Sequence, residues 1–376
     1  MVTPRFWEGR RVLVTGHTGF KGAWLSLWLQ DLGAEVTGFS LGRPSEPALF
    51  DLARVGEGMR SLEGDVRDLE AVERAVAESR AEVVLHLAAQ PIVRRSFHDP
   101  VGTYATNVMG TVHVLDAARR SEGARVVINV TSDKCYENRE WPWGYREYEP
   151  MGGHDPYSSS KGCSELVTAA YRSSFASDPN GLRLASARAG NVIGGGDWGE
   201  DRLIPDLMRA ALAGEPAIVR RPAAIRPWQH VLNPLGGYLT LAQALWEEPA
   251  QAEGWNFGPD ELDARPVGWI ANRLAALWDA GWSAAGTSPG EERSRNVHGF
   301  EWRDEREVAA PHEATYLKLD SSKARARLGW APAWDLDAAL AAIVQWYRAF
   351  HAGHDVREPT LAQIRDYGAA DAAASS

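Results

Sequence analysis

Short apolar runs alternate with longer helical patterns through the first half of the chain. Five runs have the length and composition of buried strands, and they lie at 11–15, 35–39, 82–86, 125–130 and 183–188. Segments with the spacing of helices lie between and after them, at 19–32, 107–120 and 155–175. This alternation predicts βαβ units, and therefore an α/β fold with a doubly wound parallel sheet.

The second half of the chain is less regular. Residues 203–213 and 234–245 have helical spacing, 194–197 is a glycine-rich loop, and 291–306 is dense in charge. We interpret this half as a smaller, mixed α/β region added to the sheet. The predicted division assigns 1–190 with 226–256 to the sheet domain, 191–225 with 257–360 to the second domain, and 361–376 to a tail.

Three glycines stand where the first predicted strand meets the first predicted helix. Gly16, Gly19 and Gly22 permit a tight turn, and they let backbone N–H groups approach a pyrophosphate at the helix N-terminus. A glycine-rich turn without a ligand is the alternative, but the position between strand and helix favours a dinucleotide site. We therefore expect a Rossmann-type sheet that binds a nicotinamide dinucleotide.

Other cofactor contacts are expected where the remaining strands end. The second predicted strand lacks an acidic residue at its tip, and Arg43 follows soon after, so NAD and NADP both stay open. Asn107 could steady the backbone near the catalytic strand or simply begin a helix. The predicted cofactor-binding residues, besides the pair described next, are Gly16, Thr18, Gly19, Phe20, Gly22, Ser40, Asp65, Val66, Leu87, Ala88, Ala89, Gln90 and Asn107.

Tyr157 and Lys161 are four residues apart in a predicted helix and therefore share one face. A cationic amine beside a phenol favours the phenolate and lowers its pKa from about 10. Such a base can take a proton from a hydroxyl while hydride leaves the same carbon. Only five of the 40 basic residues are lysines, so we favour this reading over an exposed helical pair, and we expect both residues to contact the cofactor as well.

Ser132, Asp133 and Lys134 directly follow the predicted strand 125–130. Ser132 is placed to hydrogen-bond the same hydroxyl. Neighbours on a regular strand face opposite sides, so Asp133 and Lys134 can reach one pocket only if the strand ends near Ser132 and the chain turns. For Asp133 the alternative is an ordinary turn residue.

Composition narrows the class of partner. A net charge of −10 argues against nucleic acid or an anionic membrane as the main partner. Two cysteines provide neither a disulfide framework nor a metal cluster, and we expect no metal. No apolar run approaches the roughly 20 residues of a membrane span, and the N-terminal residues lack the apolar segment of a secretory signal. These features predict a cytoplasmic protein.

Together these motifs resemble the extended short-chain dehydrogenase/reductase family of nucleotide-sugar enzymes, over about residues 10–347. Within it, five segments resemble the CDP-glucose 4,6-dehydratases, and they are Thr15–Gly22, Thr131–Asn138, Gly190–Trp198, Arg226–Val231 and His312–Asp320. Related dehydratases of dTDP and GDP sugars carry Asp-Glu where this chain has Asp133-Lys134.

The resemblance implies a function and a mechanism. CDP-glucose would be oxidised at C4 by NAD, lose water across C5 and C6, and regain hydride at C6, giving CDP-4-keto-6-deoxy-glucose. Tyr157 would deprotonate the 4-hydroxyl, Asp133 would protonate the departing 6-hydroxyl, and Lys134 occupies the position of the C5 base. A nucleotide-sugar 4-epimerase is the rival on the same scaffold, and a non-catalytic dinucleotide-binding regulator is a more distant one.

The resemblance also implies which residues hold the substrate and how the chain assembles. An amide at Asn191 and a guanidinium at Arg226 suit a diphosphate, although each alone also suits a structural role. The residues implied to bind the nucleotide sugar are Asn191, Arg202, Arg226 and His230. A homodimer is expected through the helices at 107–120 and 155–175.

Overall fold

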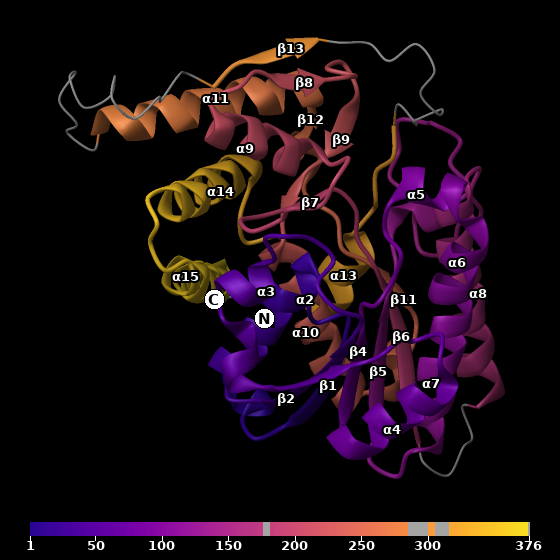
Figure 1. The fold of residues 1–376 in the computed structure, drawn as a ribbon. Helices are drawn as coiled ribbons and strands as arrows, with labels where there is room; N and C mark the ends of the chain where they lie inside the picture. The colour runs from indigo at the N-terminus through magenta and orange to yellow at the C-terminus, as the bar shows by residue number, and fades with distance from the viewer. Residues whose placement is uncertain (176–180, 285–299, 305–315, 375–376) are drawn as a thin grey trace.

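A seven-stranded sheet lies at the centre of the computed structural model, which describes residues 1–175, 181–284, 300–304 and 316–374 (Figure 1). All neighbouring strands in it are parallel. The spatial order is β11 (Gly254–Asn256), β6 (Arg183–Arg188), β5 (Val126–Val130), β4 (Val83–His86), β1 (Arg11–Thr15), β2 (Glu35–Ser40) and β3 (Arg60–Glu63). The order reverses between β1 and β4, as in a doubly wound sheet. The predicted α/β, Rossmann-type fold class is confirmed.

Both faces of the sheet are buried, which explains the unbroken apolar runs of its strands. Val12 and Val14 of β1 belong to the core beneath α2 (Phe20–Asp31) and α10 (Leu232–Glu247). Leu13 between them faces the opposite core, which includes side chains of α4 (Leu69–Ser79), α7 (Gly110–Arg120) and α8 (Pro156–Ser174). Successive strand residues face opposite sides of the sheet, so one short apolar strand packs against the helices on both faces.

The helices before α7 differ from the prediction at one point. α5 (Val93–His98) and α6 (Pro100–Tyr104) lead into a π-helical turn, η2 (Ala105–Met109), which continues directly into α7. Asn107 therefore lies inside a helical run, and its alternative reading as a helix-start residue is wrong. Single π-helical turns of this kind recur at functional sites.

Part of the second half forms a smaller mixed α/β region above the sheet in the view of Figure 1, whereas α10 and β11 belong to the sheet layer. Three two-stranded pairs join β7 (Val192–Ile193) to β10 (Gln229–His230), β8 (Ala217–Val219) to β13 (Trp302–Asp304), and β9 (Ile225–Pro227) to β12 (Ala264–Pro266). The remaining helices of the described residues are α1 (Pro4–Trp7), α3 (Leu49–Leu52), α9 (Leu203–Ala213), α11 (Val267–Ala284), α13 (Ser322–Leu328), α14 (Leu336–His351) and α15 (Arg357–Ala374), besides short 3₁₀ turns.

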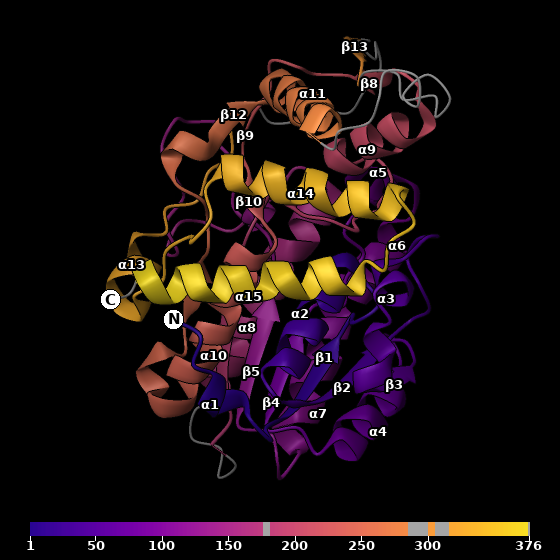
Figure 2. The same cartoon turned by 90° about the vertical axis from the view of Figure 1, so that its left-hand side faces the viewer.

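The prediction of a tail from residue 361 is wrong for 361–374. Figure 2 shows α15 as a long helix beside α14, and it packs against α2. Its buried residues include Thr360, Ile364 and Tyr367, which are spaced as one helical face. The Tyr367 ring lies 5.5 Å from that of Trp28 on α2. The alanine-rich composition suggested a frayed end, but the apolar face buries the helix.

Candidate active site

The glycine turn between β1 and α2 leaves space on one side only. Gly16 has φ +75°, and a Cβ there would lie 2.8 Å from the backbone nitrogen of Ala88. A Cβ on Gly22 would lie 2.1 Å from the Gly16 carbonyl oxygen. On Gly19 it would meet only that oxygen, at 3.3 Å. Gly19 caps α2, which begins at Phe20, and no side chain binds the first N–H groups, so they can bind an anion.

Polar side chains join the glycine turn to the end of β2. The hydroxyls of Thr18 and Ser40 are 2.9 Å apart, and His17 Nδ1 lies 3.1 Å from the Ser40 hydroxyl. His17 Nε2 lies 2.7 Å from the hydroxyl of Ser61 on β3. Burial lowers the pKa of His17 to about 4, so the ring is neutral at pH 7. His17, which was not among the predicted residues, therefore holds the predicted cofactor residue Ser40 directly and Thr18 through Ser40.

Asp65 and Val66, predicted at the adenine end, follow β3. The Asp65 carboxylate accepts hydrogen bonds from the Arg67 side chain, the shorter at 2.5 Å, and from the Arg67 backbone at 2.9 Å. The Arg67 side chain lowers the pKa of Asp65. Val66 is buried, and its carbonyl lies 2.8 Å from His113 Nδ1. Both residues are thus anchored within the protein.

The half-buried residues Leu87, Ala88, Ala89 and Gln90 follow β4, as predicted for a surface on which a cofactor could lie. Asn107 binds the last of them. The side-chain oxygen of Asn107 accepts from the Gln90 backbone N–H at 2.8 Å, and its side-chain nitrogen donates to the Gln90 backbone carbonyl at 3.0 Å. The same amide donates to the Ser160 hydroxyl on α8 at 2.8 Å. Asn107 therefore ties the end of β4 to α8.

The helix that carries the predicted redox pair begins at a fixed point. Asp155 caps α8, and its carboxylate accepts from the Ser158 backbone at 2.9 Å and from the Ser158 hydroxyl at 2.6 Å. Tyr157 and Lys161 follow on one face and are 8% and 6% exposed. The Lys161 ammonium donates to the carbonyl of Val130, at the end of β5, at 3.4 Å. The pair therefore faces the end of β5.

Burial dominates the acidity of Tyr157. It raises the pKa of the phenol to about 12, although a hydrogen bond with Ser132 and the charge of Arg202 act in the opposite direction. The charge of Asp133 adds to the increase. The lowered pKa expected from Lys161 alone is therefore wrong for this site, because desolvation of the phenolate outweighs the Ser132 hydrogen bond and the charge of Arg202.

The chain turns sharply after β5. This turn is what Asp133 and Lys134 need if both side chains are to reach one pocket. β5 ends at Val130, and a 3₁₀ turn, η3 (Asp133–Cys135), follows with Ser132 as its cap. The Ser132 hydroxyl accepts from the Lys134 backbone at 3.3 Å and donates to the Asp133 carboxylate at 2.9 Å. Asp133 is 3% exposed. Lys134 is half-buried, and its ammonium has no hydrogen bond or ion pair within the described residues.

Two of the predicted substrate residues lie near the catalytic residues Asp133 and Tyr157. The Asn191 amide donates to the Asp133 carboxylate at 3.4 Å. Arg202 forms an ion pair with Asp197 at 3.1 Å, and its charge acts on Tyr157. Since both come from the second half of the chain, the site is assembled from the sheet and the smaller region together.

The other two predicted substrate residues lie differently. Arg226 is half-buried on β9, where its Nη1 donates to the Ile225 carbonyl at 2.9 Å. His230 is fully buried, with its ring 5.8 Å from that of Trp24 and 4.9 Å from that of Trp334. A substrate contact for His230 is therefore wrong in this structure, because aromatic packing encloses its side chain.

Two further polar groups, from Lys21 and Tyr238, lie near the catalytic residues and were not predicted there. The Lys21 ammonium donates to the hydroxyl of Tyr238, on α10, at 3.4 Å. Burial lowers the pKa of Lys21 to about 7, with Lys161 and Arg202 acting in the same direction and Asp133 opposing them. Burial also lowers the pKa of Lys161, to about 8. The rarity of lysine, and its place in the glycine turn, was the available signal for Lys21; nothing pointed to Tyr238.

The chain is similar in sequence to known nucleotide-sugar dehydratases. A family model described as GDP-mannose 4,6 dehydratase matches residues 13–343. The chain belongs to this dehydratase family. Within it, the CDP-glucose 4,6-dehydratase of Salmonella typhimurium is 50% identical over 374 residues, covering 98% of this chain and 98% of that protein. The predicted resemblance to nucleotide-sugar dehydratases is confirmed.

Solved structures show how widely the fold of this dehydratase family is shared. A dTDP-glucose 4,6-dehydratase from Streptomyces venezuelae has a TM-score of 0.72 at 23% identity, covering 92% of this chain and 99% of that one. A UDP-glucose 4-epimerase from Thermus thermophilus has a TM-score of 0.71 at 24% identity, covering 90% and 99%. The two scores are nearly equal, so the fold alone does not separate dehydration from epimerisation.

Two properties of the described residues bear on the partners of this dehydratase-family chain. None of their helices is long and apolar enough to cross a membrane. In the same part of the chain, no three His, Cys, Asp or Glu side chains gather where they could hold a metal ion.

Proposed function

We propose that this chain converts CDP-glucose into CDP-4-keto-6-deoxy-glucose with NAD as a redox cofactor that is regenerated in each cycle. The observation that carries the proposal is the placement of Asp133 beside Ser132, which hydrogen-bonds the phenol of Tyr157. The 50% identity to the Salmonella typhimurium enzyme along nearly the whole chain supports CDP-glucose as the substrate.

The glycine turn fits NAD. The space beside Gly19 and the uncapped N-terminus of α2 would receive the pyrophosphate. Arg43, the residue that kept NADP open, forms an ion pair with Asp51 at 2.8 Å and so already has an anionic partner. The Streptomyces venezuelae dehydratase and the Thermus thermophilus epimerase were both solved with NAD, and this supports NAD over NADP. When bound, NAD supplies a hydride acceptor for C4 and a hydride donor for C6.

Tyr157 begins the reaction as the general base. It takes the proton of the sugar 4-hydroxyl while hydride leaves C4. Because burial raises the pKa of this phenol to about 12, its ionisation depends on positive charge brought close to it. Lys161, one helical turn away, and an oxidised nicotinamide both provide such charge. The Ser132 hydroxyl hydrogen-bonds the phenol and orients it.

Asp133 and Lys134 carry out the elimination. The ketone at C4 acidifies the C5 proton. Lys134, as the neutral amine, removes that proton and becomes the ammonium. Asp133, as the carboxylic acid, protonates the departing 6-hydroxyl and is left as the carboxylate. The hydrogen bonds from Ser132 and Asn191 hold the Asp133 carboxyl in one orientation. Lys21 is a second amine at this site, and its pKa of about 7 makes it a partner for proton exchange.

A 4-epimerase needs Tyr157 and Lys161 but has no leaving hydroxyl to protonate. The buried, doubly held Asp133 therefore favours the dehydratase. The deciding experiment is incubation with CDP-glucose and NAD, followed by alkali. The dehydratase should give the ultraviolet band of a 4-keto sugar, whereas CDP-galactose without that band would contradict the proposal.

The Lys134→Ala variant tests the elimination base. It should bind NAD normally, oxidise C4, and then stall, so that reduced cofactor accumulates. Lys318→Ala is the matched control, because Lys318 pairs with Glu261 at 3.2 Å, apart from the catalytic residues. Unchanged turnover in Lys134→Ala would show that Lys134 is not the base.

We assign the sheet domain, 1–190 with 226–256, to the dinucleotide, and 191–225 with 257–360 to the nucleotide sugar. The glycine turn and α8 belong to the first part, which supports its cofactor role. Asn191 and Arg202 reach the catalytic group from the second part, which supports its substrate role. We place the enzyme in the cytoplasm, since Cys135 and Cys163 are both free thiols.

We infer a homodimer through the outer surface of α6, η2 and α8. Figure 1 shows α6 and α8 along one side of the molecule, and η2 contacts both helices. Exposed apolar side chains there include Val101 (78%), Met109 (47%) and Leu166 (60%). Exposed apolar surface of this kind is typical of protein–protein contacts. Leu166→Glu should yield a monomer by light scattering, and Leu262→Glu, at an 80% exposed site elsewhere, should not. A wild-type monomer would contradict the inference.

A further inference from the structure

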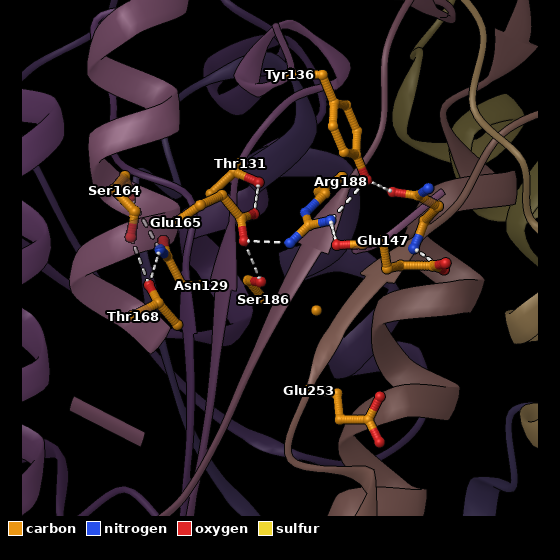
Figure 3. A network of polar contacts seen from close by, with 12 residues as sticks. Asn129, Thr131, Tyr136, Glu147, Ser164, Glu165, Thr168, Ser186, Arg188 and Glu253 are labelled. Carbon is orange, nitrogen blue, oxygen red and sulfur yellow. Dashed lines mark hydrogen bonds and ion pairs between the residues drawn. The ribbon is translucent and has the colours of Figure 1, made fainter. Parts of the chain in front are cut away.

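An ion pair is buried beneath the catalytic site, one helical turn after Lys161 (Figure 3). Glu165 accepts hydrogen bonds from the hydroxyl of Thr131, from the hydroxyl of Ser186 at 2.6 Å, and from Arg188 Nη2 at 2.7 Å. The side chains of Glu165 and Arg188 are 4% and 5% exposed. Ion pairs buried so deeply are often no more stabilising than apolar residues of the same size, so stability alone does not explain this one.

The pair contacts both ends of the catalytic turn, which we define as residues 132–135. Thr131, which binds Glu165, immediately precedes the turn. Tyr136, whose hydroxyl accepts from Arg188 Nη1 at 2.6 Å, immediately follows it (Figure 3). One ion pair therefore fixes the entry and the exit of the segment that carries Asp133.

The same pair joins the turn to α8. Glu165 is four residues after Lys161 on that helix, and the Lys161 ammonium donates to the carbonyl of Val130, next to Thr131. Two side chains of one helical face thus bind two successive residues of the chain just before the turn. The position of Asp133 relative to Tyr157 depends on these contacts.

We propose that Glu165 and Arg188 form a positioning pair that fixes the catalytic turn against α8 and places a negative charge beneath Lys161. The proposal rests on the proposed function where it uses C4 oxidation as a readout. Neither side chain is assigned to touch the substrate; the pair acts through Thr131, Tyr136 and Lys161.

The charges around Lys161 single out Glu165. The titratable groups near Lys161 come from four elements, and they are Glu165 and Tyr157 on α8, Cys135 in η3, His86 on β4 and Lys21 on α2. Burial keeps the Cys135 thiol protonated by raising its pKa, and it keeps His86 neutral by lowering its pKa to about 3. Burial would also raise the pKa of Glu165, but the charge and hydrogen bonds of its partners lower it. Glu165 is thus an anion that opposes the effect of burial on Lys161.

Two matched variants test the positioning role. Thr131→Val and Ser186→Ala each remove one hydroxyl hydrogen bond to the same buried carboxylate, but only Thr131 adjoins the catalytic turn. Thr131→Val should slow C4 oxidation, followed as reduced cofactor in a single turnover, by roughly ten-fold, because small displacements of catalytic groups are costly. Ser186→Ala should stay within about two-fold. Equal losses, or none, would overturn the proposal.

Hydrogen exchange provides a readout that does not need turnover. Amides of residues 132–135 should exchange faster in Thr131→Val than in Ser186→Ala, whatever the substrate of the enzyme. Equal exchange in the two variants would overturn the positioning role. A wild-type protein that forms no ketone from CDP-glucose would contradict the proposed function instead, so the two failures are distinct.

Glu165→Gln tests the charge. The rate of C4 oxidation should begin to fall at a pH about one unit lower than in the wild type. The reason is that Lys161 loses its proton more easily without the negative charge of Glu165. Glu165→Asp should restore the wild-type profile. An unchanged pH profile of C4 oxidation in folded Glu165→Gln would overturn the proposed effect of the Glu165 charge. If Glu165→Gln does not fold, Glu165→Asp is the test instead. An altered pH profile in folded Glu165→Asp would then overturn the same proposal.

Discussion

The two parts of the catalytic site, the face of α8 and the turn after β5, are ordered in different ways. On α8, Tyr157 and Lys161 are related by helix geometry, and a cap at Asp155 fixes where the helix begins. In the turn, Asp133 is held by contacts from Ser132 and from Asn191, 58 residues away in the chain. Local structure therefore orders Tyr157 and Lys161, whereas a tertiary contact helps to hold the Asp133 carboxyl. Removing that carboxyl should spare C4 oxidation, but displacing the whole turn, which includes Ser132, should not.

The largest effect is expected on the α8 side. Tyr157→Phe should slow C4 oxidation by about 10³-fold, because it removes the general base while keeping the ring that fills the site. Reduced cofactor in a single turnover is the measurement, and retained NAD binding is the control. Tyr148→Phe, at a 78% exposed position, should behave as wild type. A residual Tyr157→Phe rate within ten-fold of wild type would remove the phenol from its proposed role.

A smaller loss should distinguish the turn. Asp133→Asn keeps the size of the side chain but removes the acid, so the elimination should slow by about 10²-fold while C4 oxidation continues. Reduced cofactor should then accumulate during the reaction with CDP-glucose. If the formation of reduced cofactor is lost as completely as in Tyr157→Phe, the two parts of the site are not separable.

The burial of Lys161 predicts a dependence of stability on pH. Its pKa is about 8 in the folded chain, against 10.5 for a solvated lysine side chain, which is the value we take for the unfolded chain. Between these values the unfolded chain holds more protons, so the free energy of unfolding should rise with pH relative to that of Lys161→Met. The slope is at most about 1.4 kcal/mol per pH unit. Urea unfolding of both proteins at pH 8, 9 and 10 measures it, and a parallel pair of curves would contradict the shift.

The smallest effect is expected at Asn191, whose φ is +49°. Asn191→Gly tolerates that backbone and removes only the amide that binds Asp133. Loss of one long hydrogen bond to a carboxylate should slow the elimination by roughly five-fold, or about 1 kcal/mol, at saturating CDP-glucose. C4 oxidation should stay unchanged in the same single-turnover assay. If C4 oxidation slows instead, Asn191 acts on the redox pair rather than on the turn.

Regular elements were predictable because their signals are local. The strand 11–15, the helix 203–213 and the strand 183–188 agree with their predicted bounds, since each depends on a short periodic pattern. The helix α15 was missed although its buried residues follow helical spacing, because alanine-rich composition was given more weight than periodicity.

Burial and distant contacts were not predictable in the same way. A substrate contact for His230 and a lowered pKa for Tyr157 were both predicted from the sequence. In the structure, the surrounding aromatic rings enclose the histidine, and desolvation raises the pKa of the phenol. Both errors come from quantities that depend on which segments pack together, and no local pattern carries that information.

By itself, the sequence determined the βαβ order, the glycine turn and the four-residue spacing of Tyr157 and Lys161, because these follow from the local geometry of strands, turns and helices. Only the tertiary structure decided that Lys21 joins the catalytic group and that Glu165 and Arg188 bind both ends of the catalytic turn. The physical reason is that a side chain's charge state and orientation depend on burial and on partners far along the chain, which exist only once the sheet and the smaller region have packed together.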